Sequence, residues 1–396
     1  MGFEVDAVRK QFPALSEGAA HFDGPGGSQT PQVVADVVAA TMVSALANRG
    51  QLTAAERRAD AIVVDARQAM GDLLGTDPGG IVFGRSMTQL TYDFARTLAK
   101  NWGPGDEVIV TRLDHDANIR PWVQAAEAVG ATVRWLEFDP ETSELDDIAP
   151  LLSSQTRLVA VTAASNLIGT RPDVEAITTL VHDAGALVYV DGVHLTAHSA
   201  IDASFADFYA CSPYKFFGPH CGVLSAAPSL LEELHPDKLL PASNVVPERF
   251  EFGTLPYELL AGTTAAVDFI AGLGGVASGD RRERLLSSLA LVEEHEDAQR
   301  VDLEARLGAI SGITFYGHAQ RRTPTLLFSV DGWDSRAVAA KLAESGVNAP
   351  AGSFYALEAS RHLGLGDTGA VRVGLAPYTH QADVDRLVEA IETLGT

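Results

Sequence analysis

Short apolar runs alternate with stretches of helical periodicity through the first half of the chain. The run at 186–190 is apolar and β-branched, which is typical of a strand buried on both faces of a parallel sheet. Similar runs occur at 79–83, 107–111, 131–138 and 157–162, and helical patterns between them at 90–100, 121–129 and 174–184. This alternation predicts an α/β fold, with a mostly parallel sheet, helices on its faces and right-handed crossovers.

The pattern changes towards the C-terminus. A long amphipathic helix is expected at 285–307, and strand, helix, strand and helix follow at 325–330, 335–345, 371–375 and 381–394. This order predicts a smaller α+β domain, and 396 residues are enough for two domains. We expect an N-terminal segment over 1–20 that packs on the small domain, a large domain over 21–258 and a small domain over 259–396.

Composition narrows the class of protein. A net charge of −23 argues against a nucleic-acid surface, which needs clustered Lys and Arg. The two cysteines, Cys211 and Cys221, form neither a disulfide framework nor a zinc-ligand set. The first fifteen residues lack the apolar core of a signal peptide, and no window is apolar enough to span a bilayer. We therefore expect a cytoplasmic enzyme without nucleic-acid or membrane partners.

Polar side chains recur where predicted strands end. His115, Asn166 and Asp191 each follow such a strand, and the run at 205–210 leads to Ser212 and Lys215. Ligands of open α/β sheets bind beyond the carboxyl ends of the strands. The coincidence predicts one site at that edge.

The residue types indicate the chemistry of this site. A lysine amine can form a Schiff base with an aldehyde, while an acid such as Asp191 can keep a pyridine nitrogen protonated; pyridoxal phosphate (PLP) needs both. The turn that carries Ser86, Met87 and Thr88 leads from a strand into a helix, where free N–H groups favour a phosphate. Taken alone, Lys215 could be a surface lysine, Asp191 a capping residue, and Ser86 or Thr88 a simple N-cap.

Together these motifs resemble the PLP-dependent enzymes of fold type I, in the class V aminotransferase and cysteine desulfurase branch. The resemblance extends from about Phe22 to the final predicted helix. It implies that Lys215 is the Schiff-base lysine, that Asp191 pairs with the pyridine nitrogen and that His115 stacks on the ring. It also implies that His194 lies near the phenolic oxygen of the cofactor.

The same resemblance implies further contacts. Asn166 would bind the phenolic oxygen or the substrate, and Met87, Thr88 and Ser212 would hold the phosphate. Thr254 of FEFGT would reach the phosphate of a neighbouring subunit, which implies a homodimer with shared sites. For the substrate, the resemblance implies that Arg372 binds the α-carboxylate, and we expect Gly26, in the glycine-rich turn at 21–31, to bring backbone close to it.

Departures from the family pattern bear on the activity. Cysteine desulfurases carry a nucleophilic cysteine on a loop of the small domain, and the matching segment at 346–356 has none. Tyr214 also replaces the histidine that often precedes the lysine. We therefore expect a PLP-dependent enzyme that acts at Cα of a small amino acid, as an aminotransferase, with carbon–sulfur lyase or desulfurase-like activity as the alternative.

Two hypotheses of other classes remain. One is a cofactor-free binding protein on the same fold, which an intact Lys215, Asp191 and Arg372 disfavour. The other is a metal-dependent hydrolase. It would use residues from two predicted loops, namely Asp114, His115, Asp116, Asp191, His194 and His198. The i, i+4 spacing of His194 and His198 would suit a metal only on a helix, and both are expected in a loop.

Overall fold

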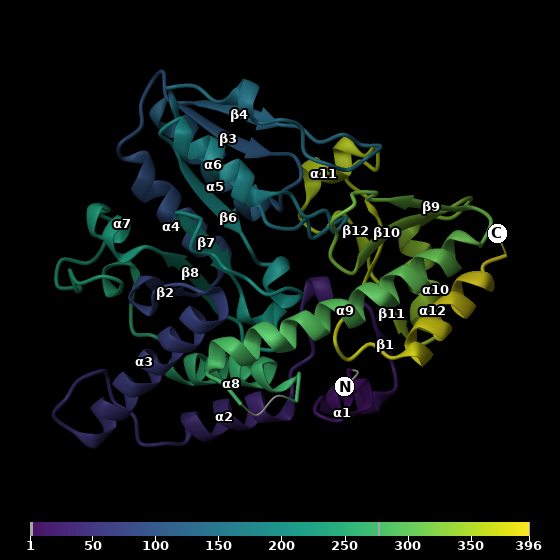
Figure 1. The fold of residues 1–396 in the computed structure, drawn as a ribbon, viewed down its shortest axis with the longest axis horizontal. Helices are drawn as coiled ribbons and strands as arrows, with labels where there is room; N and C mark the ends of the chain where they lie inside the picture. The colour runs from purple at the N-terminus through teal and green to yellow at the C-terminus, as the bar shows by residue number, and fades with distance from the viewer. Residues whose placement is uncertain (1–2, 276–277, 396) are drawn as a thin grey trace.

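A computed structural model describes residues 3–275 and 278–395 (Figure 1). Its central sheet has seven strands in the order β2-β8-β7-β6-β5-β3-β4. Only β8 is antiparallel to its neighbours, so the sheet is mostly parallel. The strands are β2 (Ile81–Gly84), β3 (Glu107–Thr111), β4 (Thr132–Leu136), β5 (Thr156–Thr162), β6 (Leu187–Asp191), β7 (Phe208–Cys211) and β8 (Gly222–Ala226).

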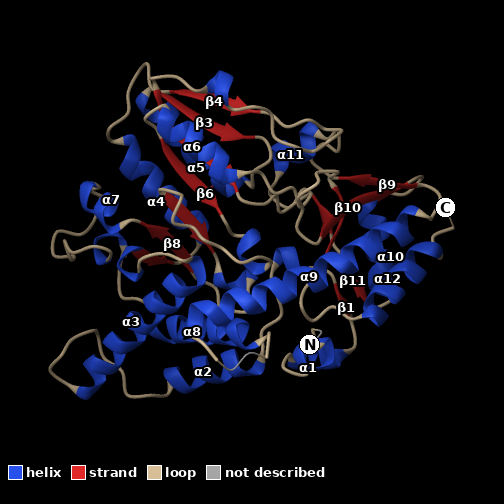
Figure 2. Ribbon diagram, in the orientation of Figure 1, coloured by secondary structure: helices blue, strands red, loops and turns tan. Residues whose placement is uncertain are grey.

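Helices cover both faces of this sheet, as Figure 2 shows. Val108 and Val110 of β3 pack with α4 and α5 on one face, while Ile109 between them packs with α3, α6 and α8 on the other. Successive side chains of a strand point to opposite faces, which explains the unbroken apolar runs of the sequence. The helices are α3 (Ala54–Leu74), α4 (Met87–Ala99), α5 (Arg120–Val129), α6 (Val174–Asp183) and α8 (Tyr257–Gly272).

A second sheet of four antiparallel strands lies in the C-terminal part, in the order β12-β13-β10-β9. The long helix α9 runs between the two sheets (Figure 1). The other elements here are β9 (Ile313–Tyr316), β10 (Thr325–Val330), β12 (Ala351–Gly352), β13 (Ala370–Gly374), α9 (Arg281–Gly308), α10 (Ser335–Glu344), α11 (Leu357–His362) and α12 (Gln381–Glu392).

The N-terminal segment contacts both parts. Strand β1 (Ala20–His21) pairs with β11 (Val347–Asn348), and Arg9 of α1 (Val5–Arg9) forms an ion pair with Asp383 of α12. Phe12, by contrast, belongs to the core beneath the central sheet. Helix α8, which begins just before the predicted boundary at 258/259, packs against α3 and against α2 (Gln32–Met42). The predicted division into domains stays a prediction.

Several element bounds differ from those predicted. The helix expected from position 90 begins at Met87, because the hydroxyl of Ser86 accepts a hydrogen bond from the Gln89 N–H and caps it there. The strand expected from 205 begins only at Phe208. Strands β8 and β9 were not predicted. Within the described ranges, no helix is both long and apolar enough to cross a bilayer.

Candidate active site

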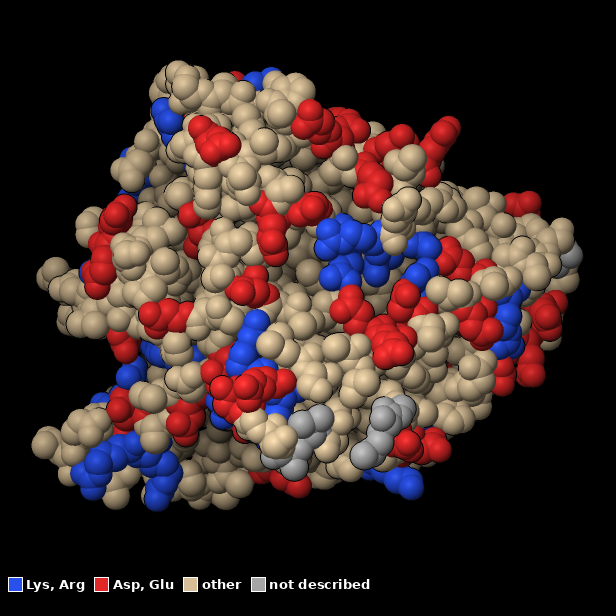
Figure 3. Space-filling model, viewed as in Figure 1, with Lys and Arg blue, Asp and Glu red and all other residues tan. Residues whose placement is uncertain are grey.

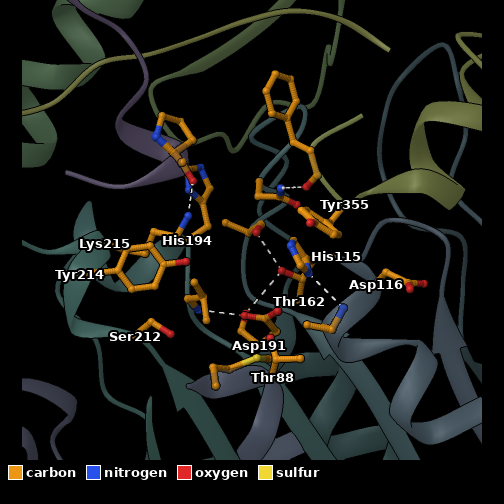
Figure 4. Close-up of a pocket in the computed structure, with 18 of the residues that line it drawn as sticks. Thr88, His115, Asp116, Thr162, Asp191, His194, Ser212, Tyr214, Lys215 and Tyr355 are labelled. Atoms are coloured by element: carbon orange, nitrogen blue, oxygen red, sulfur yellow. Dashed lines mark hydrogen bonds between the residues drawn. The ribbon is translucent and has the colours of Figure 1, made fainter. Parts of the chain in front are cut away.

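A cavity of about 640 Å³ lies at the carboxyl ends of β5, β6 and β7, with one wall from each sheet. In Figure 4, Lys215 and Tyr214 face His115 and Tyr355 across it, with Asp191 and Thr88 at its base. Its lining includes most of the predicted site residues, namely Gly26, Met87, Thr88, His115, Asn166, Asp191, His194, Ser212, Lys215 and Arg372. The prediction that strand ends would bring these residues together therefore agrees with the lining of the cavity.

Lys215 reaches the cavity from the 3-10 turn that follows β7. Its amine donates a hydrogen bond to the carbonyl oxygen of Pro25 and lies 4.9 Å from the centre of the Tyr214 ring. Burial and the positive charge of Arg372 lower the pKa of Lys215 to about 7, against the opposing effect of Asp191. About half of the amine is therefore neutral and nucleophilic near pH 7.

Asp191 is the last residue of β6. Its Oδ1 accepts a hydrogen bond from the Val193 N–H (2.9 Å), and burial raises its pKa to about 6. The next residue must be glycine, since a Cβ at Gly192 would lie 2.0 Å from the ring of Tyr209. At neutral pH this buried carboxylate is mostly ionised, so it can pair with a cation that enters the cavity.

His115 is neutral at physiological pH, because burial and the charge of Lys215 lower its pKa to about 4. Its Nδ1 accepts a hydrogen bond from the Ala117 N–H (3.0 Å), so the ring proton is on Nε2. The ring stacks against Tyr355, with 5.5 Å between the ring centres and 27° between the planes. A neutral, flat imidazole can pack on a planar ligand without an ionic penalty.

A buried polar network fixes the turn that carries His115. The side chain of Asp114 is fully buried and accepts hydrogen bonds from Asn118 Nδ2 (2.6 Å) and the Thr162 N–H (3.0 Å). Burial raises the pKa of Asp114 well above its usual value. In turn, Asn118 Oδ1 accepts from Trp122 Nε1 (3.1 Å). The carboxyl group of Asp114 therefore finds its hydrogen-bond partners within the protein.

The N-terminus of α4 forms the candidate phosphate cradle. Met87 and Thr88 are its first two residues, whose N–H groups have no carbonyl one turn earlier to bond. A Cβ at Gly222 would lie 2.3 Å from the backbone of Ser86, so glycine lets β8 pack directly on the helix start. Ser86 is not among the residues that line the cavity, and its hydroxyl caps the helix, so its role toward a phosphate stays a prediction.

Arg372 projects from β13 and carries a buried charge into the cavity. Its Nη1 donates to the carbonyl oxygen of Asn166 (2.9 Å), and the Phe354 ring centre lies 3.7 Å from its Cζ. Burial lowers its pKa to about 9, so it remains a cation at neutral pH. Among the described residues, the buried Nε of Arg372 and Oδ1 of Asn166 have no hydrogen-bond partner. An unsatisfied edge of a buried guanidinium suits a carboxylate.

The aromatic part of this wall, Phe354 and Tyr355, was not predicted from the sequence. Phe354 and Tyr355 both adopt positive φ values, 52° and 60°. Their carbonyl oxygens accept hydrogen bonds from Asn166 Nδ2 (2.9 Å) and the Asp116 N–H (2.7 Å), respectively. The segment that lacks the desulfurase cysteine is therefore held across the cavity by the central sheet. Spacing along the chain carries no signal for such a contact.

Two other predicted residues have different surroundings. His194 lines the cavity, but its Nε2 bonds to the hydroxyls of Thr323 (2.9 Å) and Thr325 (3.0 Å). Thr254 is exposed and lies outside the lining, so its predicted role stays a prediction that needs a second subunit. No group of three or more His, Cys, Asp or Glu side chains in the described ranges could hold a metal ion.

Comparisons with known proteins agree with this geometry. Residues 20–387 match the family model described as aminotransferase class-V. The chain is 33% identical to an aminotransferase-like protein of Gibberella zeae, covering 98% of both chains. It is 30% identical to a probable cysteine desulfurase of Pseudomonas aeruginosa, covering 97% of this chain and 96% of that one. The crystal structure of an Escherichia coli cysteine desulfurase superposes with a TM-score of 0.85 at 28% identity, covering 99% and 98%.

Proposed function

Because the chain belongs to the PLP-dependent aminotransferase class V family, we propose that it binds PLP in this cavity and acts as an aminotransferase on a small amino acid. The observation that carries the proposal is that Lys215 and Asp191 line one cavity, together with His115 and Arg372. When bound, PLP withdraws electrons from Cα of the amino acid and so makes its proton labile.

The cavity fits this cofactor. Lys215 would bind it covalently, Asp191 would pair with the pyridine nitrogen and His115 would cover the ring. The N–H groups of Met87 and Thr88, with the helix dipole of α4, would hold the phosphate together with Ser212. The buried Oδ1 of Asn166 lacks a partner within the described part of the chain, and a cofactor or substrate hydroxyl would supply one.

The protein side chains divide the work on the amino acid. The free edge of Arg372 would bind the α-carboxylate bidentately, while Phe354 keeps one face of the guanidinium from water. By fixing the α-carboxylate, this contact would determine which bond of Cα points toward the amine of Lys215. The amine of Lys215, with its pKa of about 7, can then accept and return the Cα proton near neutral pH.

An aminotransferase is favoured over a cysteine desulfurase because no suitable thiol is present. Cys211 and Cys221 are buried, and burial raises the pKa of both, that of Cys221 to about 11. The segment at 346–356 has no cysteine and is held to the central sheet through Phe354 and Tyr355. A carbon–sulfur lyase, which needs no acceptor thiol, is the second candidate.

We also propose a homodimer, with Thr254 reaching the site of the second subunit. Large apolar side chains are exposed on the segment 239–252, which precedes Thr254 in the chain, at the end of α2 and in the loop that follows α2. Leu240 is 97% exposed and Val43 87%, and the others are Met42, Leu52, Leu239, Val245 and Phe252. Burying such side chains against a second copy would remove them from water. Two free cysteines suit a reducing compartment, and we propose the cytoplasm.

The visible absorption spectrum with added PLP, recorded beside Lys215→Ala, tests the proposal. We expect a band above the protein envelope that requires Lys215, bleaches with one amino acid and recovers with a keto acid. Release of pyruvate and sulfide from cysteine would favour the lyase instead. The absence of any lysine-dependent band would overturn the enzyme proposal and leave a cofactor-free binding protein.

A further inference from the structure

A second, much smaller cavity shares two residues with the candidate active site. It has a volume of about 10 Å³ and is lined by Lys215, His194 and His198, among others. This volume is close to what a single water molecule requires. The walls offer the amine and the imidazoles as hydrogen-bonding partners. Lys215 therefore contacts two cavities, one of which an amino acid would fill and one of which is too small for it.

His198 connects the small cavity to a buried carboxyl group. Its Nδ1 lies 2.8 Å from Oε2 of Glu296 on α9, and the two residues are 7% and 1% exposed. This leaves Nε2 as the nitrogen that can exchange a proton with the small cavity. The ring also meets that of His194 edge-on, with 5.0 Å between the centres. His194 is fixed by Thr323 and Thr325, so it orients its neighbour.

Glu296 in turn lines a third cavity, of about 630 Å³, which opens to the surface. Its Oε1 is buried and, within the described residues, has no hydrogen-bond partner. Burial raises the pKa of Glu296, while His198 acts in the opposite direction. A raised pKa makes this carboxyl group a better proton acceptor than an exposed glutamate.

The rim of the outer cavity is strongly charged and exposed. The side chains of Arg321, Asp297 and Glu293 are 60%, 56% and 42% exposed. In Figure 3, basic and acidic atoms lie side by side near the middle of the face that α9 crosses. The charged groups that surround the His198–Glu296 pair here are Arg171, Glu293, Glu294, Asp297, Arg300, Arg321 and Arg322. Protons that reach this rim exchange with bulk water.

We propose that His198 and Glu296 relay protons between Lys215 and the solvent of the outer cavity, behind the bound amino acid. The Lys215 ammonium gives a proton to a water in the small cavity, which gives one to Nε2 of His198. The ring releases its Nδ1 proton to Oε2 of Glu296, and Glu296 releases it to water. One proton leaves Lys215 and one enters the solvent, and the reverse sequence returns it. The inference rests on the proposed function.

Deuterium content per turnover tests the relay. The reaction is run in D₂O with an amino acid that bleaches the Lys215-dependent band and carries protium at Cα. In the parent protein, Lys215 exchanges its proton before returning it, so recovered amino acid contains deuterium. Because the amine carries two deuterons in D₂O, the ammonium formed on accepting the Cα proton holds one protium and two deuterons. Return without exchange therefore still delivers deuterium in up to about two of three events. We expect deuterium at nearly every returned position in the parent, and protium to be retained in about one of three events or more in His198→Gln and Glu296→Gln. In His198→Gly, imidazole can occupy the space that the ring leaves and should restore the exchange in proportion to its concentration, which loss of a merely structural contact would not produce.

His182→Gln is the matched control. His182 also lies 2.8 Å from a carboxylate, that of Asp207, but its side chain is 45% exposed and lines none of the three cavities. The amino acid recovered from His182→Gln should contain as much deuterium per turnover as that from the parent. If His198→Gln and Glu296→Gln match the parent as well, with the band intact, the relay is wrong. If His198→Gln loses the band, Glu296→Gln decides, since it preserves volume and leaves the ring in place.

A second readout needs no cofactor. Ring resonances of the histidines in the unloaded protein report on their surroundings. Lys215→Met should change those of His198 and His194 through the small cavity and leave those of His182 unchanged. Lys100→Met, which removes a bond to the backbone of His235, should change neither those of His198 nor those of His194. Unchanged His198 resonances would contradict the relay. Absence of a Lys215-dependent band in the parent would be a different failure, that of the proposed function itself.

Discussion

The two walls of the candidate active site are built differently. The wall from the central sheet carries Lys215, Asp191 and His115, each placed by the end of a strand. The side chains of Asp191 and His115 accept bonds from N–H groups two residues further along the chain, while the amine of Lys215 donates to the carbonyl oxygen of Pro25. The wall from the C-terminal part carries Arg372, Phe354 and Tyr355, which are held by bonds that cross to the other wall. The first wall holds the groups that would transfer protons, and the second holds those that would bind the substrate carboxylate and shield it from water. Variants of the two should therefore differ in which kinetic constant they change.

The largest effect is expected at Asp191, on the first wall. Asp191→Asn keeps the size of the side chain but removes the negative charge opposite the pyridine nitrogen. We expect kcat to fall by about 10²- to 10⁴-fold, as for loss of a group that controls proton transfer, with little change in KM. Steady-state kinetics measure both constants. A change confined to KM would contradict the proposed difference between the two walls.

Arg372→Ala tests the second wall. It removes the charged partner of the α-carboxylate and leaves Asn166 and Phe354 without their contact. Loss of a charge-assisted hydrogen bond predicts a kcat/KM about 10- to 10²-fold lower, carried mainly by KM. The Lys215-dependent absorption band should persist, because the cofactor contacts come from the other wall. Loss of that band would show that the two walls are not separable.

The pH dependence of PLP capture sharpens the role of the first wall. Burial and Arg372 lower the pKa of Lys215 to about 7, and only the neutral amine attacks the aldehyde. The rate at which the band forms should rise about tenfold per pH unit below 7 and level off above it. In Arg372→Ala, where a cation is removed, the midpoint should move to higher pH. A midpoint near 10 in the parent would contradict this account of Lys215.

The smallest effect is expected at Phe354. Phe354→Ala removes the ring that lies 3.7 Å from the Arg372 guanidinium and admits water to that face. A cation–π contact in a desolvated site predicts a rise in KM of roughly 3- to 30-fold, with kcat nearly unchanged. Phe354→Leu serves as the control that restores apolar cover without the ring. Equal KM values for the parent and Phe354→Ala would show that Phe354 does not contribute to substrate binding.

The first wall could be predicted from the sequence, for a physical reason. Strand ends are visible as breaks in apolar runs, and parallel strands place their carboxyl ends at one edge. The positions of Asp191, His115 and Asn166 along the chain are therefore enough to assign them to one site. Lys215 belongs to the same group because β7 is parallel to β6.

The second wall could be predicted only in part. The arginine at 372 was identified through the family resemblance, but its partners Phe354 and Asn166 are brought to it by the packing of two sheets. Tyr355 reaches His115 across 240 positions of the chain, and its left-handed backbone has no marker such as glycine. The role of Ser86 cannot be assigned from the sequence, because a capping serine and a phosphate-binding serine occupy the same place in a turn.

The most direct measurement of the central claim is the site of covalent attachment of PLP. Borohydride reduction of the PLP-loaded protein, followed by peptide mass spectrometry, identifies the lysine that carries the pyridoxyl group. The chain has only five lysines, at 10, 100, 215, 238 and 341, so each can be assigned. The account predicts modification of Lys215 at one equivalent of PLP, lost in Lys215→Ala. Modification of the exposed Lys10, Lys100 or Lys341 in its place, or none, would contradict it.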